Sequence, residues 1–140
     1  MNNIFISIGL FALVVAFTTI FLVYYQVNII VQTVRQDLYY ASNNAILSFD
    51  VQDLSYRKYT VNMAQAKETI ESLLNKNYTQ SGGSIKKIQI TNLDTKYEQD
   101  KVNLDVEVQV TFRSVINLVG ENEHKFKLNE NIKISLLKYE

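Results

Sequence analysis

The first 34 residues of this chain contain no Asp, Glu, Lys or Arg, and the chain as a whole contains no Cys, Pro or Trp. Without cysteine, disulfides, thiolate catalysis and Cys-based metal sites are excluded. A single histidine, His124, cannot by itself form a zinc site of the usual kinds. The lack of proline removes the strongest helix breaker, so long helices are permitted.

All the charged side chains follow Val34, and they comprise 14 basic and 14 acidic residues. This balance gives no clustered basic surface of the kind that nucleic acid requires. The sequence also lacks a Walker loop, a GxSxG elbow and a GxGxxG fingerprint. We therefore predict that the protein is not an enzyme, and we predict no cofactor, no metal, no nucleic acid and no small-molecule ligand.

Residues 4–25 read IFISIGLFALVVAFTTIFLVYY, an uninterrupted apolar run that ends on two tyrosines. At about 1.5 Å per residue a helix of this length crosses the roughly 30 Å hydrocarbon core, and tyrosine favours the headgroup level. The run predicts a transmembrane helix over residues 1–26, with membrane lipid as its partner. A cleaved signal peptide is the alternative, although a basic leader is lacking. We expect a cytoplasmic N-terminus and an extracytoplasmic C-terminal domain in the cell membrane.

No Gly or Pro interrupts the chain between Gly9 and Gly82, so the helix is predicted to continue outside the membrane over residues 27–50. One face of this helix carries small or aliphatic residues three or four positions apart. The predicted helix-packing residues are Gly9, Ala12, Ala16, Thr19, Val27, Val31, Val34, Leu38, Ala41 and Ala45. Two interpretations remain open. Either this stripe packs against a partner helix, or its upper part covers the protein's own sheet and its lower part arises by chance. Both interpretations can also hold at different heights along the helix.

Residues 51–140 are predicted to form a small domain with one short helix and a three-stranded antiparallel sheet. Asn62 and Gln65 form a capping-box pattern before the helix over residues 63–78. Strands are predicted over residues 85–92, 102–113 and 125–137, the second from strict apolar alternation between Val102 and Phe112. The sequence GENE at residues 120–123 indicates a hairpin turn. The fold class is therefore α+β, with a long N-terminal transmembrane helix.

Glu130 interrupts the inward apolar pattern of the third predicted strand. A buried carboxylate would be a candidate site. We expect instead a β-bulge over residues 129–131 that turns Glu130 to solvent.

The architecture resembles that of type IV pilin-related proteins, and among them the TadE-like minor pilins. The resemblance rests on the uncharged run to Val34, on RQDLYYASNNAI at residues 35–46, and on the stretches VTFRSVINLVG and FKLNENIKISLLKYE. It implies a long helix, half in the membrane, that carries a small antiparallel sheet. The chain departs from the family at Gly9, which follows no basic residue, and at Val14, where processed pilins have Glu. Taken together, the resemblance and these two departures imply an accessory subunit that is not processed at its N-terminus.

Two hypotheses for function follow. The first is a membrane-anchored structural or accessory subunit of a pilus-like or secretion assembly, which acts through protein partners of the N-terminal helix and through domain contacts. The second is a bitopic sensor whose extracytoplasmic domain binds a ligand, which requires a concave apolar pocket with convergent polar groups.

Overall fold

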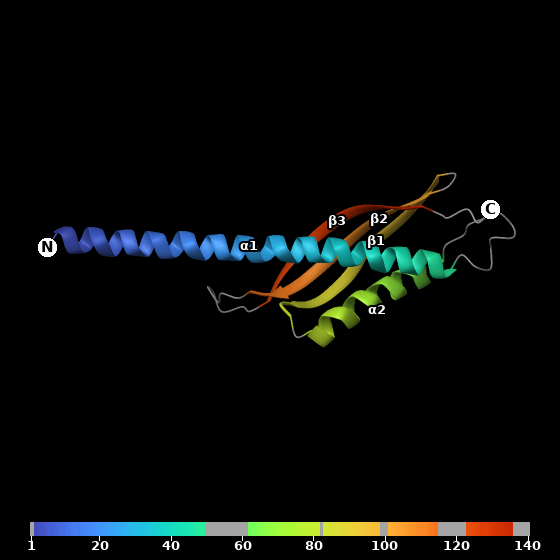
Figure 1. Ribbon diagram of the computed structural model, residues 1–140, viewed down its shortest axis with the longest axis horizontal. Coiled ribbons are helices and arrows are strands. Elements are labelled where there is room, and N and C mark those ends of the chain that lie inside the picture. Colours follow the sequence, from blue (N-terminus) through green and yellow to red (C-terminus); the bar gives the residue numbers. More distant parts are fainter. Residues whose placement is uncertain (1, 50–61, 82, 99–100, 115–122, 136–140) are drawn as a thin grey trace.

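The computed structural model describes residues 2–49, 62–81, 83–98, 101–114 and 123–135. They form helices α1 (Asn2–Phe49) and α2 (Met63–Ser81) and strands β1 (Ile85–Glu98), β2 (Lys101–Arg113) and β3 (Glu123–Ser135). The strands make one antiparallel sheet in the order β1-β2-β3, which confirms the predicted α+β class. In Figure 1 the first half of α1 projects beyond the sheet and α2, and the second half lies along them.

Helix α1 is continuous from Asn2 to Phe49, as the absence of helix breakers predicted. Its few polar side chains in the apolar half bond within the helix. The hydroxyls of Ser7, Thr18 and Thr19 donate to main-chain carbonyls four residues earlier, at 2.8–2.9 Å. These bonds leave no hydroxyl proton unsatisfied on the apolar surface.

Helix α2 begins where the capping pattern predicted. The Asn62 side-chain Oδ1 accepts a hydrogen bond from the Gln65 main-chain N–H at 3.3 Å, which satisfies one of the free donors of the first turn. Three apolar residues one or two turns apart, Ala66, Ile70 and Leu74, are fully buried. The next position in this pattern is Tyr78, which is also buried, so the apolar face runs nearly the whole length of the helix.

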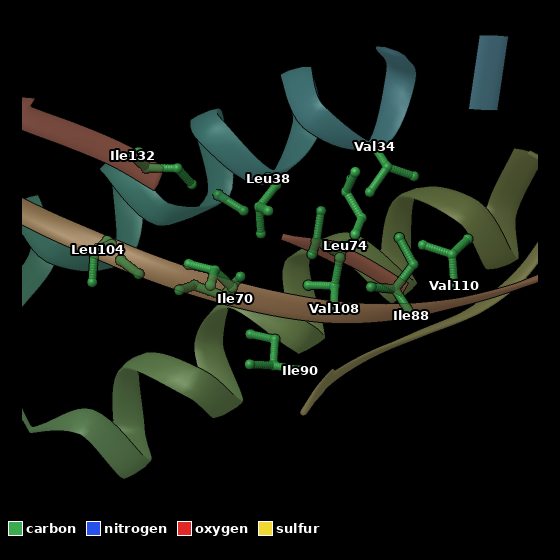
Figure 2. Packing of buried hydrophobic residues seen from close by; sticks show 14 of the residues in the cluster. Val34, Leu38, Ile70, Leu74, Ile88, Ile90, Leu104, Val108, Val110 and Ile132 are labelled. Atoms are coloured by element: carbon green, nitrogen blue, oxygen red, sulfur yellow. The ribbon is translucent and has the colours of Figure 1, made fainter. Parts of the chain in front are cut away.

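The core is a single layer between the two helices and one face of the sheet (Figure 2). Strand β2 lies at its centre and shows the alternation that the sequence predicted. Its buried side chains are Val102, Leu104, Val106, Val108, Val110 and Phe112. Burial of an aliphatic side chain contributes about 1.5–3 kcal/mol before conformational entropy, so this strand supplies a large part of the folding free energy.

Strand β1 is longer than predicted, extending to Glu98, and it contains register shifts after Ile85 and after Ile90. Its outer edge is covered by α2. The Asn75 side chain donates to the Ile88 carbonyl and accepts from the Ile88 N–H, both at 3.0 Å, and a Glu71 carboxylate oxygen accepts the Ile90 N–H at 2.6 Å. These bonds satisfy main-chain groups that an edge strand would otherwise leave unpaired.

Strand β3 begins two residues earlier than predicted, and its apolar residues Leu128, Ile132 and Ile134 are buried. The predicted turn at Gly120 and the predicted strand end at residues 136–137 lie outside the described residues.

The predicted bulge at Glu130 is wrong. Strands β2 and β3 pair without a register shift, and Glu130 lies directly opposite Val106, whose side chain is buried on the helix-covered face. Glu130 therefore faces the helices, where its carboxylate accepts a hydrogen bond from the Arg35 guanidinium of α1. The side chain is 23% exposed, and the ion pair with α1 together with this partial solvation makes the position tolerable for a charge.

Candidate membrane and helix-packing surface

The N-terminal half of α1 exposes large apolar side chains on every side. Phe5, Phe11 and Phe21 are each at least 66% exposed, and the large aliphatic side chains between residues 4 and 22 are 47–67% exposed. A soluble domain buries a helix of this kind, because a helix that is apolar all round has no face suited to water. Here no other described part of the chain covers it.

Among the described elements, α1 is the one helix long and apolar enough to cross a membrane by length and composition. Its most apolar window has a mean hydropathy of 2.6 and is not buried within the protein. An N-terminal signal sequence can also meet these criteria of length and composition, so this property indicates a candidate span.

A hydrogen bond marks the place where the folded domain meets the exposed half of α1. The Gln26 side-chain Nε2 donates to the Arg113 main-chain oxygen at the end of β2, at 2.9 Å. Tyr24 and Tyr25, directly before it, are 71% and 56% exposed. The end of the sheet is therefore held beside the first polar residue that follows the apolar run.

Of the predicted helix-packing residues, the lower members lie on the exposed half of α1. Ala12, Ala16 and Thr19 line a shallow groove whose walls are Phe11, Val15 and Ile20. At Gly9 the space is open, since a Cβ atom built there has no neighbour within 4 Å. The fold of the chain itself therefore places no steric demand on the small side chains of this lower stripe.

The upper members of the stripe lie in the protein's own core. Val34, Leu38, Ala41 and Ala45 are 0–4% exposed, and Val27 and Val31 pack against the same cluster. This packing supports the interpretation in which the upper stripe covers the chain's own sheet. The segment 27–50 was assigned from sequence to a continuation of the helix separate from the domain, but its buried residues from Ile30 to Ile46 share one core with described residues of α2 and the sheet.

Beyond the exposed apolar half of α1, helices α1 and α2 are joined by a polar contact that the sequence did not indicate. The Tyr78 hydroxyl donates to a carboxylate oxygen of Asp37 at 2.6 Å. Burial of the ring raises the pKa of Tyr78, and the hydrogen bond and charge of Asp37 raise that pKa further. The phenol therefore stays protonated and remains a donor throughout the physiological range.

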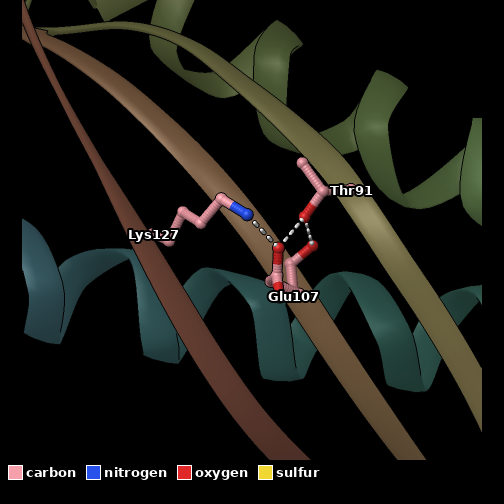
Figure 3. Close-up of polar contacts among 3 residues, drawn as sticks. All are labelled: Thr91, Glu107 and Lys127. Carbon is pink, nitrogen blue, oxygen red and sulfur yellow. Dashed lines mark hydrogen bonds and ion pairs between the residues drawn. The ribbon is translucent and has the colours of Figure 1, made fainter.

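The open face of the sheet is polar, and two of its acidic residues, Glu107 and Asp105, have side-chain partners (Figure 3). A Glu107 carboxylate oxygen accepts from the Thr91 hydroxyl at 2.6 Å and from the Lys127 ammonium at 2.9 Å. These hydrogen bonds lower the pKa of Glu107. Asp105 accepts a hydrogen bond from Asn131 and lies 3.9 Å from the Lys96 ammonium.

A shallow depression on this part of the sheet is lined by Asn92, Asp105, Val106, Glu107, Asn129, Glu130 and Asn131. Six of its seven lining residues carry an amide or a carboxylate group, apolar atoms make up most of the surface exposed in it, and it is open to solvent and not enclosed. No group of three or more His, Asp or Glu side chains placed to hold a metal ion occurs among the described residues. His124 is exposed and lies against the Phe112 ring, with 5.7 Å between ring centroids.

The chain was compared with protein-family models, with curated proteins and with solved structures, and none of them matches it.

Proposed function

We propose that this chain is a single-pass membrane protein that serves as a structural or accessory subunit of a pilus-like or secretion assembly. Residues 4–25 of α1 cross the bilayer, with the N-terminus cytoplasmic and the sheet domain extracytoplasmic. The observation that carries this proposal is the exposed apolar half of α1, which continues without a break into the core of a folded domain.

The continuity of α1 favours an assembly role. Val34, Leu38 and Ala45 are buried in the domain core, and α1 is continuous. The membrane half of α1 is therefore rigidly connected to the sheet. Such a connection transmits the position of the helix directly to the domain, which suits a subunit that packs beside others. A long helix half covered by an antiparallel sheet is also the plan that the resemblance to pilin-related proteins implies.

The stripe of Gly9, Ala12 and Ala16 is the face that would meet a partner helix. Small residues let helix backbones approach closely in lipid, where packing drives association. Substitutions at this face do not disturb the domain, because these side chains have no contact with it. Partner packing can therefore be tested separately from folding.

Disulfide trapping in native membranes provides the test, and the absence of native cysteine makes it clean. We expect the single variants Ala12→Cys and Ala16→Cys to crosslink to another copy or to a neighbouring subunit. Val14→Cys, about 200° around the helix from Ala12, is the matched control and should crosslink much less. If Ala12→Cys and Ala16→Cys form no adduct, or no more than Val14→Cys, the packing role is rejected.

The membrane span is tested by carbonate extraction of the same membranes. The full-length chain should remain in the pellet. Recovery of the uncleaved chain in the supernatant would refute the span, and a shortened chain there would identify the apolar run as a cleaved signal.

A further inference from the structure

Four basic residues lie at the end of the sheet nearest the membrane half of α1. Lys86 and Lys87 follow the first residue of β1, Arg113 is the last residue of β2, and Lys125 is the third residue of β3. Lys87 and Lys125 both pair in register with Thr111, one on each side of β2, so the four residues belong to one sheet end. We call them the proximal basic cluster. All four side chains are exposed.

The cluster is not neutralised within the described part of the chain. The ion pairs there involve Arg35, Lys96 and Lys127, none of which is a member of the cluster. Among the described residues at this sheet end, Glu123, opposite Arg113 in the register, is the acidic one, so four positive charges stand there against one negative charge. The chain as a whole carries no net charge, so the excess is a matter of placement.

The hydrogen bond between Gln26 and Arg113 fixes the position of this cluster along the axis of α1. Residues 4–25 measure roughly 33 Å as a helix, which matches the ~30 Å hydrocarbon core. Gln26 then lies in the headgroup layer, which is about 5–7 Å deep on each side. Lys87 and Lys125 are two register positions from the end of β2, or about 7 Å along the strand. That distance is within the Debye length of about 8 Å in physiological salt.

We propose that the proximal basic cluster binds the anionic phospholipid headgroups of the bilayer that α1 crosses. This inference rests on the proposed membrane span. The positive charges face a surface whose phosphates carry the complementary charge, and lysine and arginine side chains reach the interface readily from such positions. Each basic residue near an anionic surface strengthens binding to that surface about fivefold. The cluster therefore enriches acidic lipid around the anchor, and it holds the sheet end at a fixed distance from the bilayer.

The test is electron spin resonance of lipids spin-labelled on the acyl chain, with the full-length chain reconstituted in phosphatidylcholine vesicles. The immobilised fraction of labelled phosphatidylglycerol is compared with that of labelled phosphatidylcholine. We expect the native chain to favour phosphatidylglycerol by about fivefold or more at low salt, with the preference falling towards one at 0.5 M salt because surface charges are screened.

Two variants with equal charge loss locate the effect. The cluster variant is Lys86→Gln, Lys87→Gln, Arg113→Gln and Lys125→Gln. The control variant, at positions towards the far end of the domain, is Lys67→Gln, Lys96→Gln, Lys101→Gln and Lys133→Gln. The cluster variant should lose the preference and the control should keep it. The bond from Gln26 uses a main-chain oxygen, so it survives the change at Arg113.

The outcomes separate this inference from the proposed span. If neither labelled lipid is immobilised, α1 does not contact acyl chains, and the span itself fails. If both lipids are immobilised equally by the native chain, the span stands and headgroup binding is refuted. Equal loss of preference in the two variants would also refute it, because overall charge and not the cluster would then be responsible.

Discussion

The two halves of α1 share one unbroken helix and a high apolar content, yet their surroundings are opposite. Phe11, in the first half, is 71% exposed, and Leu38, in the second, is fully buried. The second half is apolar on one stripe and carries Arg35 and Asp37 on other faces, whereas the first half is apolar on all faces. A one-sided stripe is satisfied by one sheet, but a helix that is apolar all round needs an apolar medium on every side.

The largest expected effect comes from removing the second half of α1 from the domain. A fragment of residues 50–140 lacks Ile30, Val34, Leu38 and Ile46, which at about 1.5–3 kcal/mol each amount to roughly 6–12 kcal/mol. That loss is comparable with the whole stability of a small domain, about 5–15 kcal/mol. We expect residues 50–140 to remain unfolded by circular dichroism, and residues 26–140 to fold and melt cooperatively without detergent. Cooperative melting of the shorter fragment would show that the domain does not depend on α1.

Much of this contrast could be predicted from sequence. The alternation from Val102 to Phe112 identified the central strand, because a period of two over that length has one structural solution. The absence of helix breakers predicted that α1 would be continuous. These features depend on neighbours in the chain, and local physical chemistry is sufficient for them.

The contacts between distant segments could not be predicted in the same way. Glu130 was expected on a bulge because its partner, Arg35, is 95 positions away. Nothing in the local sequence distinguishes Asn75, because its bonds to Ile88 depend on the placement of α2 along the edge of β1. The upper half of the helix stripe likewise fitted either a partner or the chain's own sheet, since both present an apolar surface.

A single pair of substitutions sharpens the comparison between the two halves of α1. Leu38→Ala removes a fully buried side chain and should lower the free energy of unfolding of the domain by about 3 kcal/mol, within the usual range of about 2–5. Leu13→Ala, the same change at a 54% exposed position, should alter it by less than about 0.5 kcal/mol. Denaturant unfolding of the full-length chain in detergent, followed by circular dichroism, measures both values. Equal losses would mean that the membrane half contributes to the domain core.

The smallest expected effect is that of pH on stability. A change in pH should alter the stability of the folded domain and should leave the membrane association of the proposed anchor unchanged. The hydrogen bonds from Thr91 and Lys127 lower the pKa of Glu107 below its ordinary value of 4.5 in the folded state. A lowered pKa means that the ionised form favours folding. The contribution is therefore complete above pH 4.5 and is lost as the pH falls through the lowered value.

Glu107→Gln should remove this part of the acid dependence, so that the native chain and the variant converge in stability as the pH falls below 4.5. Glu68→Gln, at an exposed position on α2, controls for the loss of one carboxylate and should leave the acid dependence near that of the native chain. Thermal melts between pH 6 and pH 3 measure the difference. Over the same range the fraction of the chain that sediments with membranes should not change, because residues 1–34 contain no Asp, Glu, Lys, Arg or His. Release of the native chain from membranes at pH 3 would show that ionisable groups of the domain help to hold the first half of α1 in lipid. That result would contradict the separation between an uncharged first half, which acts as the anchor, and a titratable domain that includes the second half.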